Sequence, residues 1–428
     1  MARYEQPSTG PGGGHRVVVT GMGVVSPVGT GAGPFWDALL QGRTAWSPGP
    51  GDSRVQVAAV PDDGAWDADI KGSTKRYSDR AGRLAIAAAR MAVRSSGWEF
   101  VPRPRRRADV GPTEDQQAVQ DRVGVVVGSS IGGVGSLWEE FSAAAVQGTE
   151  AMTPFILARA LINMIPASIA IDLGIRGESL GVAGACAAGT MAIGEAYRRI
   201  RDGHLTAAVA GGTDACLVPA VMAPFRTIGA MSPAGAEHGI RPFAADRNGF
   251  LMGEGAAMLV LETDDSARAR GAKVLAEIVG YHASTDAVSL FAPDPAGIRI
   301  AVEGVLEDTG VSPDDVVHIN AHATGTHAND AAESAVYGDL FPHLPPLAAV
   351  KANTGHALGA SGALEAVATV MALRAGLVPP VAGLRGEDVD PDVQVNPVLG
   401  EPAPLPRPGV GLSASFAFGG QNAVLAIR

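Results

Sequence analysis

The sequence predicts a layered α/β fold, and three observations support this prediction. Short apolar runs that end at glycine are typical of buried strands, and residues 17–21 form the first of them. Ala-rich amphipathic stretches lie between these runs, as expected of helices that cover a sheet. Hydrophobic residues make up 46% of the 428 residues and charged residues only 18%, which is typical of a globular chain. Together these features indicate buried sheets between layers of helices.

The first half of the chain contains several of these elements in order. We expect buried strands at 17–21 (closed by a turn at Gly21), 123–128, 207–212 and 257–261, and helices at 84–93 and 189–200. The polar stretch 102–121 interrupts this order, and we expect it to be a surface insertion. It contains Arg103, Arg105, Arg106 and Arg107.

A second cycle of strands and helices begins near Lys273. We expect strands at 274–280, 316–320, 411–420 and 423–428, helices at 297–308 and 360–375, and a proline-rich surface segment at 379–408. The two cycles indicate two similar halves, residues 16–271 and 272–428. They follow a loose polar tail at residues 1–15.

Composition excludes several classes of function. The net charge of −11 argues against nucleic-acid binding, which relies on basic side chains that neutralise phosphates. Two cysteines exclude a disulfide framework and fit a reducing cytoplasm. We find no zinc-type Cys/His spacing and therefore predict no metal. Since no run of about 20 apolar residues occurs, we expect no membrane span.

Cys186 is the first candidate for chemistry. It lies among small residues (184–190) at the start of a predicted helix. The positive end of the helix dipole lowers the pKa of such a thiol and makes thiolate available. A buried structural cysteine is the alternative for this residue alone, since free cysteine is usually buried. Cys216 lacks a comparable setting and is expected to be structural.

Two histidines lie in Gly- and Thr-rich turns, where side chains usually reach a cleft. His322 follows a predicted strand, and His356 precedes an Ala-rich helix. Neutral imidazoles can donate hydrogen bonds to a developing enolate oxygen. Either histidine alone could be structural, but together with Cys186 they suggest thiolate chemistry on an acyl thioester.

These motifs resemble those of the β-ketoacyl-acyl carrier protein synthases of the Cys-His-His elongating type, in the thiolase superfamily. The resemblance covers nearly the whole chain, from Val17 to Arg428. It rests on the turn around Cys186 and on segments 320–330, 351–356 and 416–420, with further likeness at 241–250 and 253–255. It implies a thiolase-like α-β-α-β-α fold built from two similar halves.

The resemblance also implies a decarboxylative Claisen condensation. Cys186 would accept an acyl chain from a carrier-protein thioester, and His322 and His356 would assist decarboxylation of malonyl-carrier protein and hold the enolate. Backbone amides of Cys186 and Phe418 would form the oxyanion hole. No cofactor is implied, because the substrates arrive on the phosphopantetheine of an acyl carrier protein.

Further roles follow from the resemblance alone. Lys351 and Glu333 would support the catalytic site, with Asp330 in the associated acidic position. Structural ion pairs, turn caps and plain core packing are the alternatives for these residue types. The remaining assignments are Thr324 and Thr326 for pantetheine binding, Phe416 and Phe418 for gating, Ile131 and Phe225 for the acyl pocket, and Lys75 and Arg76 for carrier-protein docking. The arginine cluster at 103–107 could dock the carrier too, although a solvated loop is more typical.

Three residues depart from the family pattern: Ala417 and Ala323 replace glycines, and Val288 replaces a frequent aromatic residue. None removes a reacting atom, but the Cβ of Ala417 restricts the backbone of the gating loop.

Other activities fit the chain less well. A thiolase would need a second reactive cysteine after Cys216, and a coenzyme A-primed Cys-His-Asn synthase would have asparagine in place of His356. A non-catalytic partner subunit, like the chain-length factors, would lack the nucleophile. Ala417 and Val288 favour type II polyketide biosynthesis over housekeeping fatty acid elongation. The resemblance implies a dimer, either of two copies or with a chain-length factor.

Overall fold

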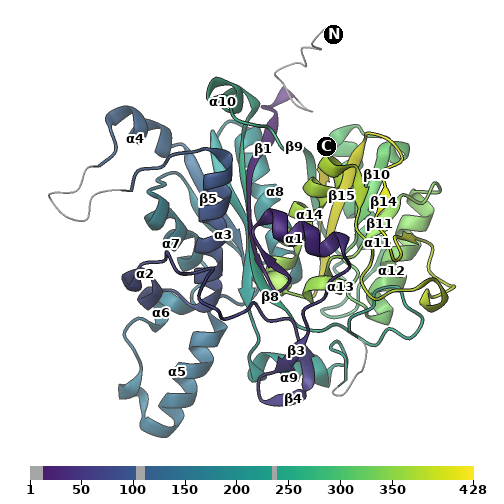
Figure 1. Ribbon diagram of the computed structural model, residues 1–428, viewed down its shortest axis with the longest axis horizontal. Coiled ribbons are helices and arrows are strands. Elements are labelled where there is room, and N and C mark those ends of the chain that lie inside the picture. Colours follow the sequence, from purple (N-terminus) through teal and green to yellow (C-terminus); the bar gives the residue numbers. More distant parts are fainter. Residues whose placement is uncertain (1–12, 103–110, 234–238) are drawn as a thin grey trace.

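The computed structural model describes residues 13–102, 111–233 and 239–428. A 12-stranded mixed sheet runs through the molecule, with helices packed against it (Figure 1). Five strands come from the first half: β1 (Val17–Ser26), β5 (Val123–Gly128), β6 (Ser179–Val182), β7 (Ala207–Ala215) and β8 (Glu254–Thr263). Their counterparts in the second half are β9 (Ala276–Thr285), β10 (Val316–Asn320), β11 (Pro346–Ala348), β15 (Val410–Ala417) and β16 (Gln421–Ile427).

The two halves share one strand order. From the middle outward it is β1-β8-β7-β5-β6 in the first half and β9-β16-β15-β10-β11 in the second. In both halves the first two pairings are antiparallel and the last two are parallel. Strand β1 pairs with β9 and so joins the halves. The predicted α/β fold of two similar halves is therefore confirmed, while the exact domain limits stay a prediction.

Two helices form the middle layer. Helices α8 (Ala188–Arg201) and α14 (Ser361–Ala375) contact each other and strands of both halves. Helices α3 (Arg80–Ser96) and α7 (Met164–Leu173) contact strands of the first half, and α11 (Pro295–Thr309) contacts β9 and β16 of the second, with α12 (His327–Leu340) packed against α11. The stretch Leu358–Ala375 is long and apolar enough to cross a membrane, but 78% of it is buried inside the protein. We therefore assign α14 to the protein core.

Most predicted elements are confirmed within a few residues, but the turn expected at Gly21 is wrong. Strand β1 continues through a bulge between Val19 and Gly21. A Cβ on Gly21 would lie 2.1 Å from the carbonyl oxygen of Ala92, so this glycine allows α3 to approach the strand closely. The sequence signal of a buried run followed by glycine therefore marked a close helix–strand contact, not a strand end.

Shorter elements complete the described fold. The predicted insertion contains α4 (Glu114–Gln120), which starts with a capping box at Thr113. Its four arginines at 103–107 lie outside the described residues. Segment 379–408 contains turns, the 3-10 helix Gly386–Asp388 and two short strands, and it lies only partly at the surface as predicted, because Val381 and Leu384 are buried. The remaining helices and strands are α1 (Ala32–Leu40), α2 (Gly72–Tyr77), α5 (Val134–Gln147), α6 (Ile156–Ala160), α9 (Pro219–Thr227), α10 (Asp264–Ala269), α13 (Lys351–Thr354), β2 (Gly29–Thr30), β3 (Ser47–Gly49), β4 (Asp52–Val57), β12 (Leu377–Val378), β13 (Asn396–Pro397) and β14 (Ala403–Pro404).

Candidate active site

Cys186 lies in a sharp turn directly ahead of α8. It is the middle residue of the 3-10 turn η3 (Ala185–Ala187), and Ala185 has the left-handed φ of 45°. Such a conformation is uncommon for a residue with a side chain and often marks a functional site. A Cβ on Gly184 would lie 2.4 Å from the sulfur of Met191, so small residues are required around this thiol. The Cys186 side chain is buried, with 8% of the residue exposed.

The structure brings both histidines to this thiol. His356 Nε2 lies 3.0 Å from Cys186 Sγ, and its Nδ1 lies 3.1 Å from the hydroxyl of Ser361. The ring of His322 is 5.6 Å from that of His356, at an interplanar angle of 85°. Three segments far apart in the sequence therefore converge on one sulfur, as the sequence predicts.

The thiol at this site is held in its neutral form. Burial raises the pKa of Cys186 to about 12, against the opposing effects of the Lys351 charge and the backbone N–H groups of Cys186 and Phe418. The prediction that the helix N-terminus lowers this pKa is therefore wrong, because desolvation outweighs the nearby donors. Burial, and then the charge of Lys351, lower the pKa of His356 well below its usual value. The neutral imidazole can accordingly accept the proton of the thiol.

Lys351 fixes the orientation of His322. Its ammonium group donates to the carbonyl oxygen of His322 at 2.6 Å, lies 3.1 Å from His322 Nδ1 and pairs with Glu365 Oε1 at 2.5 Å. Because the ammonium group donates to Nδ1, the proton of the neutral ring is on Nε2. Burial lowers the pKa of His322 well below its usual value, as does the charge of Lys351. His322 therefore offers an N–H donor to the site.

Glu365 is a residue of the candidate site that the sequence analysis did not name. It lies on α14, is buried and pairs with Lys351, while burial raises its pKa. A single carboxylate within a mostly apolar helix is the sequence signal that could have revealed it.

Glu333 holds the turn that carries His322 and touches none of the reacting groups. Its carboxylate accepts hydrogen bonds from the backbone N–H groups of His322 (2.7 Å) and Ala323 (2.8 Å) and from the hydroxyl of Tyr337. Ala323 has a left-handed φ of 42°, which these bonds hold in place. Burial raises the pKa of Glu333 to about 7. The placement makes Glu333 a positioning residue and not a catalytic one.

Asp330 has a similar role on the preceding turn of α12. It accepts hydrogen bonds from the backbone N–H groups of Phe243 (3.0 Å) and Gly325 (3.2 Å), and burial raises its pKa. Asp330 and Glu333 therefore both support the loop between β10 and α12.

A cavity of about 640 Å³ opens onto Cys186. Phe418 covers it, since its ring stacks on Phe225 at 5.8 Å and meets Phe291 edge-on at 5.5 Å. The hydroxyls of Thr324 and Thr326 lie 2.9 Å apart in its wall. The predicted site residues that line it are Cys186, Phe225, His322, Thr324, Thr326, His356, Phe416 and Phe418.

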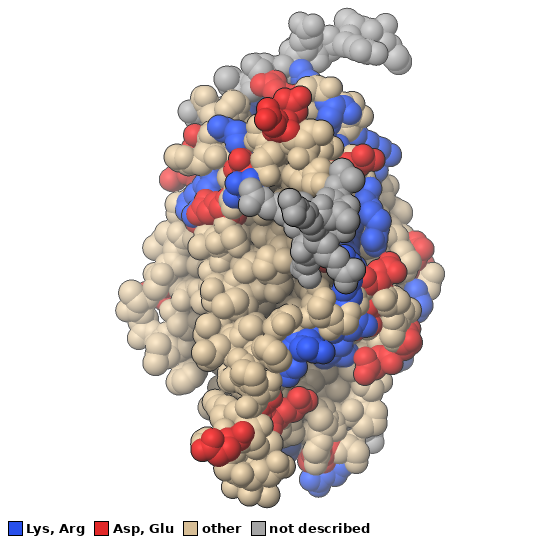
Figure 2. Space-filling model, turned by 90° about the vertical axis from the view of Figure 1, so that its left-hand side faces the viewer, with Lys and Arg blue, Asp and Glu red and all other residues tan. Residues whose placement is uncertain are grey.

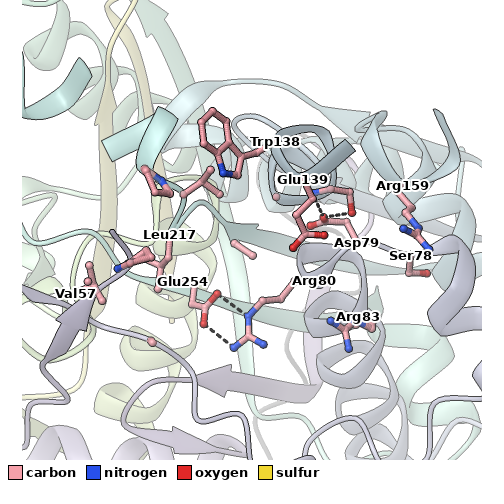
Figure 3. Close-up of a pocket in the computed structure, with 18 of the residues that line it drawn as sticks. Val57, Ser78, Asp79, Arg80, Arg83, Trp138, Glu139, Arg159, Leu217 and Glu254 are labelled. Atoms are coloured by element: carbon pink, nitrogen blue, oxygen red, sulfur yellow. Dashed lines mark hydrogen bonds and ion pairs between the residues drawn. The ribbon is translucent and has the colours of Figure 1, made fainter. Parts of the chain in front are cut away.

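Three predicted site residues lie elsewhere. Ile131 is 38% exposed and lies outside this cavity, so the structure does not bring it to the thiol within one chain. Lys75 and Arg76 are on α2, and Lys75 pairs with Asp67 at 2.9 Å. Lys75 lines a second cavity of about 950 Å³, which Figure 3 shows with Trp138, Arg83, Arg159 and the Arg80–Glu254 ion pair.

Three buried side-chain oxygens lie on the contacting elements β10, β15 and α14. Asn320 Oδ1, Glu365 Oε2 and Ser413 Oγ have no hydrogen-bond partner among the described residues. Asn320 and Ser413 are register partners on β10 and β15, and Asn320 Nδ2 donates to the backbone oxygen of Glu365 at 3.1 Å. Such a donor set suits a hard cation. The described residues contain no His/Cys/Asp/Glu cluster arranged for a metal, and the predicted absence of a metal stays a prediction.

Comparison with known proteins gives the family. Residues 14–267 match the family described as "Beta-ketoacyl synthase, N-terminal domain", and residues 275–385 match its C-terminal domain. The chain belongs to the β-ketoacyl synthase family. The predicted resemblance is thereby confirmed, and so is the assignment as an acyltransferase of the ketosynthase type.

Relatives align along almost the full length of this ketosynthase. The chain is 35% identical over 424 residues to 3-oxoacyl-[acyl-carrier-protein] synthase 2 of Synechocystis sp., covering 96% of this chain and 98% of the relative. It is 34% identical to nodulation protein E of Rhizobium leguminosarum bv. trifolii, covering 96% and 99%.

Solved structures of ketosynthases are similar to almost the whole chain as well. The ishigamide ketosynthase/chain length factor superposes with a TM-score of 0.85 at 34% identity, covering 97% of this chain and 99% of that one. A type II polyketide synthase acyl-carrier protein in complex with its ketosynthase, bound to a hexaketide, gives a TM-score of 0.83 at 26% identity, with the same coverage.

Proposed function

We propose that the protein catalyses the decarboxylative condensation of an acyl chain held on Cys186 with malonyl-acyl carrier protein. The observation that carries this proposal is the 3.0 Å contact between Cys186 Sγ and His356 Nε2, with His322 beside it. In the first step the thiol proton passes to His356 while the sulfur attacks the carbonyl carbon of the carrier thioester. The N–H groups of Cys186 and Phe418 stabilise the oxyanion. The carrier thiolate then leaves and takes the proton from His356.

In the second step malonyl-carrier protein occupies the emptied cavity. Its carboxylate leaves as carbon dioxide, and the resulting enolate oxygen accepts a hydrogen bond from His322 Nε2–H. It accepts a second one from His356 after the neutral His356 ring has exchanged its proton from Nδ1 to Nε2 through solvent. The enolate carbon attacks the acyl-Cys186 carbonyl, which forms the new carbon–carbon bond and releases the Cys186 sulfur as a thiolate. The thiolate regains its proton from solvent, and the product leaves as β-ketoacyl-carrier protein. Thr324 and Thr326 contact the pantetheine arm, Phe225 contacts the acyl chain, and Phe416 and Phe418 gate the thiol. The reaction uses no cofactor of the protein.

The partner that delivers both substrates is an acyl carrier protein. The solved ketosynthase complex with an acyl-carrier protein supports this assignment. Lys75 and Arg76 dock the acidic carrier, and the side chain of Lys75 is 34% exposed beside Asp67. We place the reaction in the cytoplasm.

The protein works as a dimer through an apolar face. Figure 2 shows a broad area with few charged side chains on the side that carries α5 and α6. Strand β6 ends the sheet, and within the described residues it pairs with β5 alone. The large exposed apolar side chains of α5, α6 and α7 that contribute to this face are Trp138, Phe141, Val146, Leu157 and Ile171. Exposed large apolar side chains that gather on one face are typical of a contact with another subunit.

The pathway is type II polyketide biosynthesis in this proposal. Ala417 and Val288 set the chain apart from the usual elongating enzyme, and the type II polyketide synthase ketosynthase among the solved structures supports this pathway. Fatty acid elongation is the alternative, supported by the 3-oxoacyl-[acyl-carrier-protein] synthase 2 relative. A non-catalytic chain-length-factor-like role is disfavoured because the Cys186–His356 contact and the Lys351–His322 contact are both in place.

Intact-mass analysis tests the proposal. The wild-type chain, incubated with a panel of acyl-carrier proteins, should gain the mass of one acyl group on the Cys186 peptide, and the chain lengths that load should separate the two pathways. Cys186→Ala should stay folded and gain no mass. Acylation at another residue, or condensation by the Cys186→Ala variant, would refute the assignment of the nucleophile.

A further inference from the structure

A fully buried carboxylate that takes no part in the proposed reaction steps contacts segments that lead to Cys186 and His356. Asp214, near the end of β7, is 0% exposed. It accepts hydrogen bonds from the Ser129 hydroxyl (2.7 Å), the Ser130 N–H (2.9 Å), the Ser130 hydroxyl (2.6 Å) and the Gly359 N–H (2.7 Å). Burial raises its pKa, while these donors favour the charged form.

The donors belong to segments that lead to the two reacting groups. Ser129 also donates its backbone N–H to Val182 (3.1 Å), at the end of the strand that precedes Cys186. Gly359 lies in the 3-10 turn η5 (Leu358–Ala360), which follows His356. One carboxylate therefore connects the nucleophile-bearing half with the histidine-bearing half.

The packing around this connection leaves no room for side chains. A Cβ on Gly359 would lie 2.7 Å from Asp214 Oδ2, and a Cβ on Gly189, in the first turn of α8, would lie 2.6 Å from the Gly359 carbonyl oxygen. A Cβ on Gly212 would lie 2.3 Å from the same oxygen. The η5 turn thus rests on β7 and on the helix that begins next to Cys186, and Asp214 holds it there.

We propose that Asp214 is a positioning residue for the condensation, because it sets the approach of His356 to Cys186. This inference rests on the proposed function, in which His356 takes the thiol proton. The Asp214→Asn side chain cannot accept from all four donors, since its NH₂ group faces N–H and O–H groups. The η5 turn then relaxes, and the Cys186–His356 contact lengthens.

The negative charge of Asp214 also affects the pKa of the Cys186 thiol, and this effect can be measured separately. This charge raises the pKa of Cys186, in opposition to Lys351. Asp214→Asn removes the charge, so thiolate forms at lower pH in the variant. A merely structural role would change the amount of folded protein but would not move the pH at which the thiol reacts.

The experiment compares full-length Asp214→Asn with wild type and with Glu262→Gln as a matched control. Glu262 is an equally buried carboxylate, bonded to Thr20 and Arg270 at the opposite end of neighbouring β8. We expect Asp214→Asn to lower kcat by about tenfold or more, with KM for malonyl-carrier protein within about twofold. We also expect it to shift the pH midpoint of iodoacetamide alkylation of Cys186 downward. Glu262→Gln should lower the Tm and leave both readouts near wild type.

A folded Asp214→Asn variant with the kcat and the alkylation profile of wild type would overturn the inference. The inference would also be overturned if Asp214→Asn and Glu262→Gln both lost activity only in proportion to their decrease in Tm. If Asp214→Asn does not fold, Ser130→Ala removes one donor and should give a smaller fall in kcat, whereas an unchanged kcat overturns the inference. Alkylation needs no acyl substrate. The alkylation readout therefore tests Asp214 even if the wild-type chain does not condense acyl groups. The absence of condensing activity in wild type would refute the proposed function alone.

Discussion

At the scale of single residues, burial decides the protonation states of the site. Cys186, His322 and His356 are all neutral at pH 7, because desolvation disfavours both thiolate and imidazolium. In the proposed reaction, charge develops when the thiol proton moves to His356. The Lys351 ammonium and the backbone N–H groups of Cys186 and Phe418 favour the negative charge on the Cys186 sulfur. The site thus keeps its nucleophile unreactive until a substrate arrives.

The pH dependence of stability at Glu333 tests how strongly burial shifts a pKa in this site. Its pKa is raised from 4.5 to about 7 in the folded protein. The folded chain therefore binds this proton more tightly than the unfolded chain. The contribution of the protonated Glu333 carboxyl to the free energy of unfolding is full below about pH 4.5 and is lost as the pH rises through about 7. We expect the free energy of unfolding of wild type, relative to Glu333→Gln, to fall by a few kcal/mol between pH 5 and about pH 8.

Urea unfolding at several pH values measures this difference. Glu303→Gln serves as the control, because Glu303 is half exposed on α11 and its pH profile should run parallel to wild type. Parallel profiles for wild type and Glu333→Gln would show that the Glu333 carboxyl titrates normally in the folded protein.

At the scale of elements, segment 416–420, which is proposed to gate the thiol, is hydrogen-bonded to the segment 286–290. Gly419 donates its N–H to Leu290 (2.8 Å), and Asp286 donates to the carbonyl oxygen of Gly420 (2.8 Å). Gly419 and Gly420 have positive φ values of 84° and 67°, whereas Ala417 is the last residue of β15 and pairs with Gln421. The closed segment therefore needs glycine at 419 and 420 but tolerates alanine at 417.

We expect Ala417→Gly to accelerate opening of this segment. Loss of the Cβ gives the strand end more backbone conformations. Acylation of Cys186 by acyl-carrier protein should become a few-fold faster, measured by quenched-flow mass spectrometry under single-turnover conditions. Ala414→Gly, at a buried position of the same strand, is the control and should lower stability without faster acylation. An unchanged acylation rate in Ala417→Gly would mean that backbone freedom at 417 does not limit loading.

The sequence predicted most elements because apolar runs and Ala-rich stretches report burial locally. It also found Cys186, His322, His356 and Lys351, which lie in distinctive Gly- and Thr-rich turns. It failed where the outcome depends on packing between distant segments. Gly21 contacts α3 instead of ending a strand, and Glu365 becomes functional only because α14 passes beside Lys351. The direction of the Cys186 pKa shift was missed for the same reason, since desolvation depends on the whole fold.

At the scale of the whole molecule, the two similar halves each contribute residues to the candidate site. The first half supplies Cys186 ahead of α8, and the second supplies both histidines and Lys351. The two middle helices, α8 and α14, pack against each other and bring these groups together. The site therefore forms only when both halves fold, and we expect its activity to be lost in one step with the tertiary structure.

The apolar face of the first half predicts the assembly state. Phe141 on α5 is 57% exposed, and a charge there would have to be desolvated in an apolar interface. We expect wild type to be a dimer, alone or mixed with a chain-length-factor partner, and Phe141→Asp to shift it to monomer. Light scattering coupled to size-exclusion chromatography measures the mass. Ile300→Glu, at an exposed position on α11 of the other half, is the control and should leave the dimer intact. A monomeric wild type, both alone and with such a partner, would contradict the predicted interface, because this apolar area would then have no subunit to cover it.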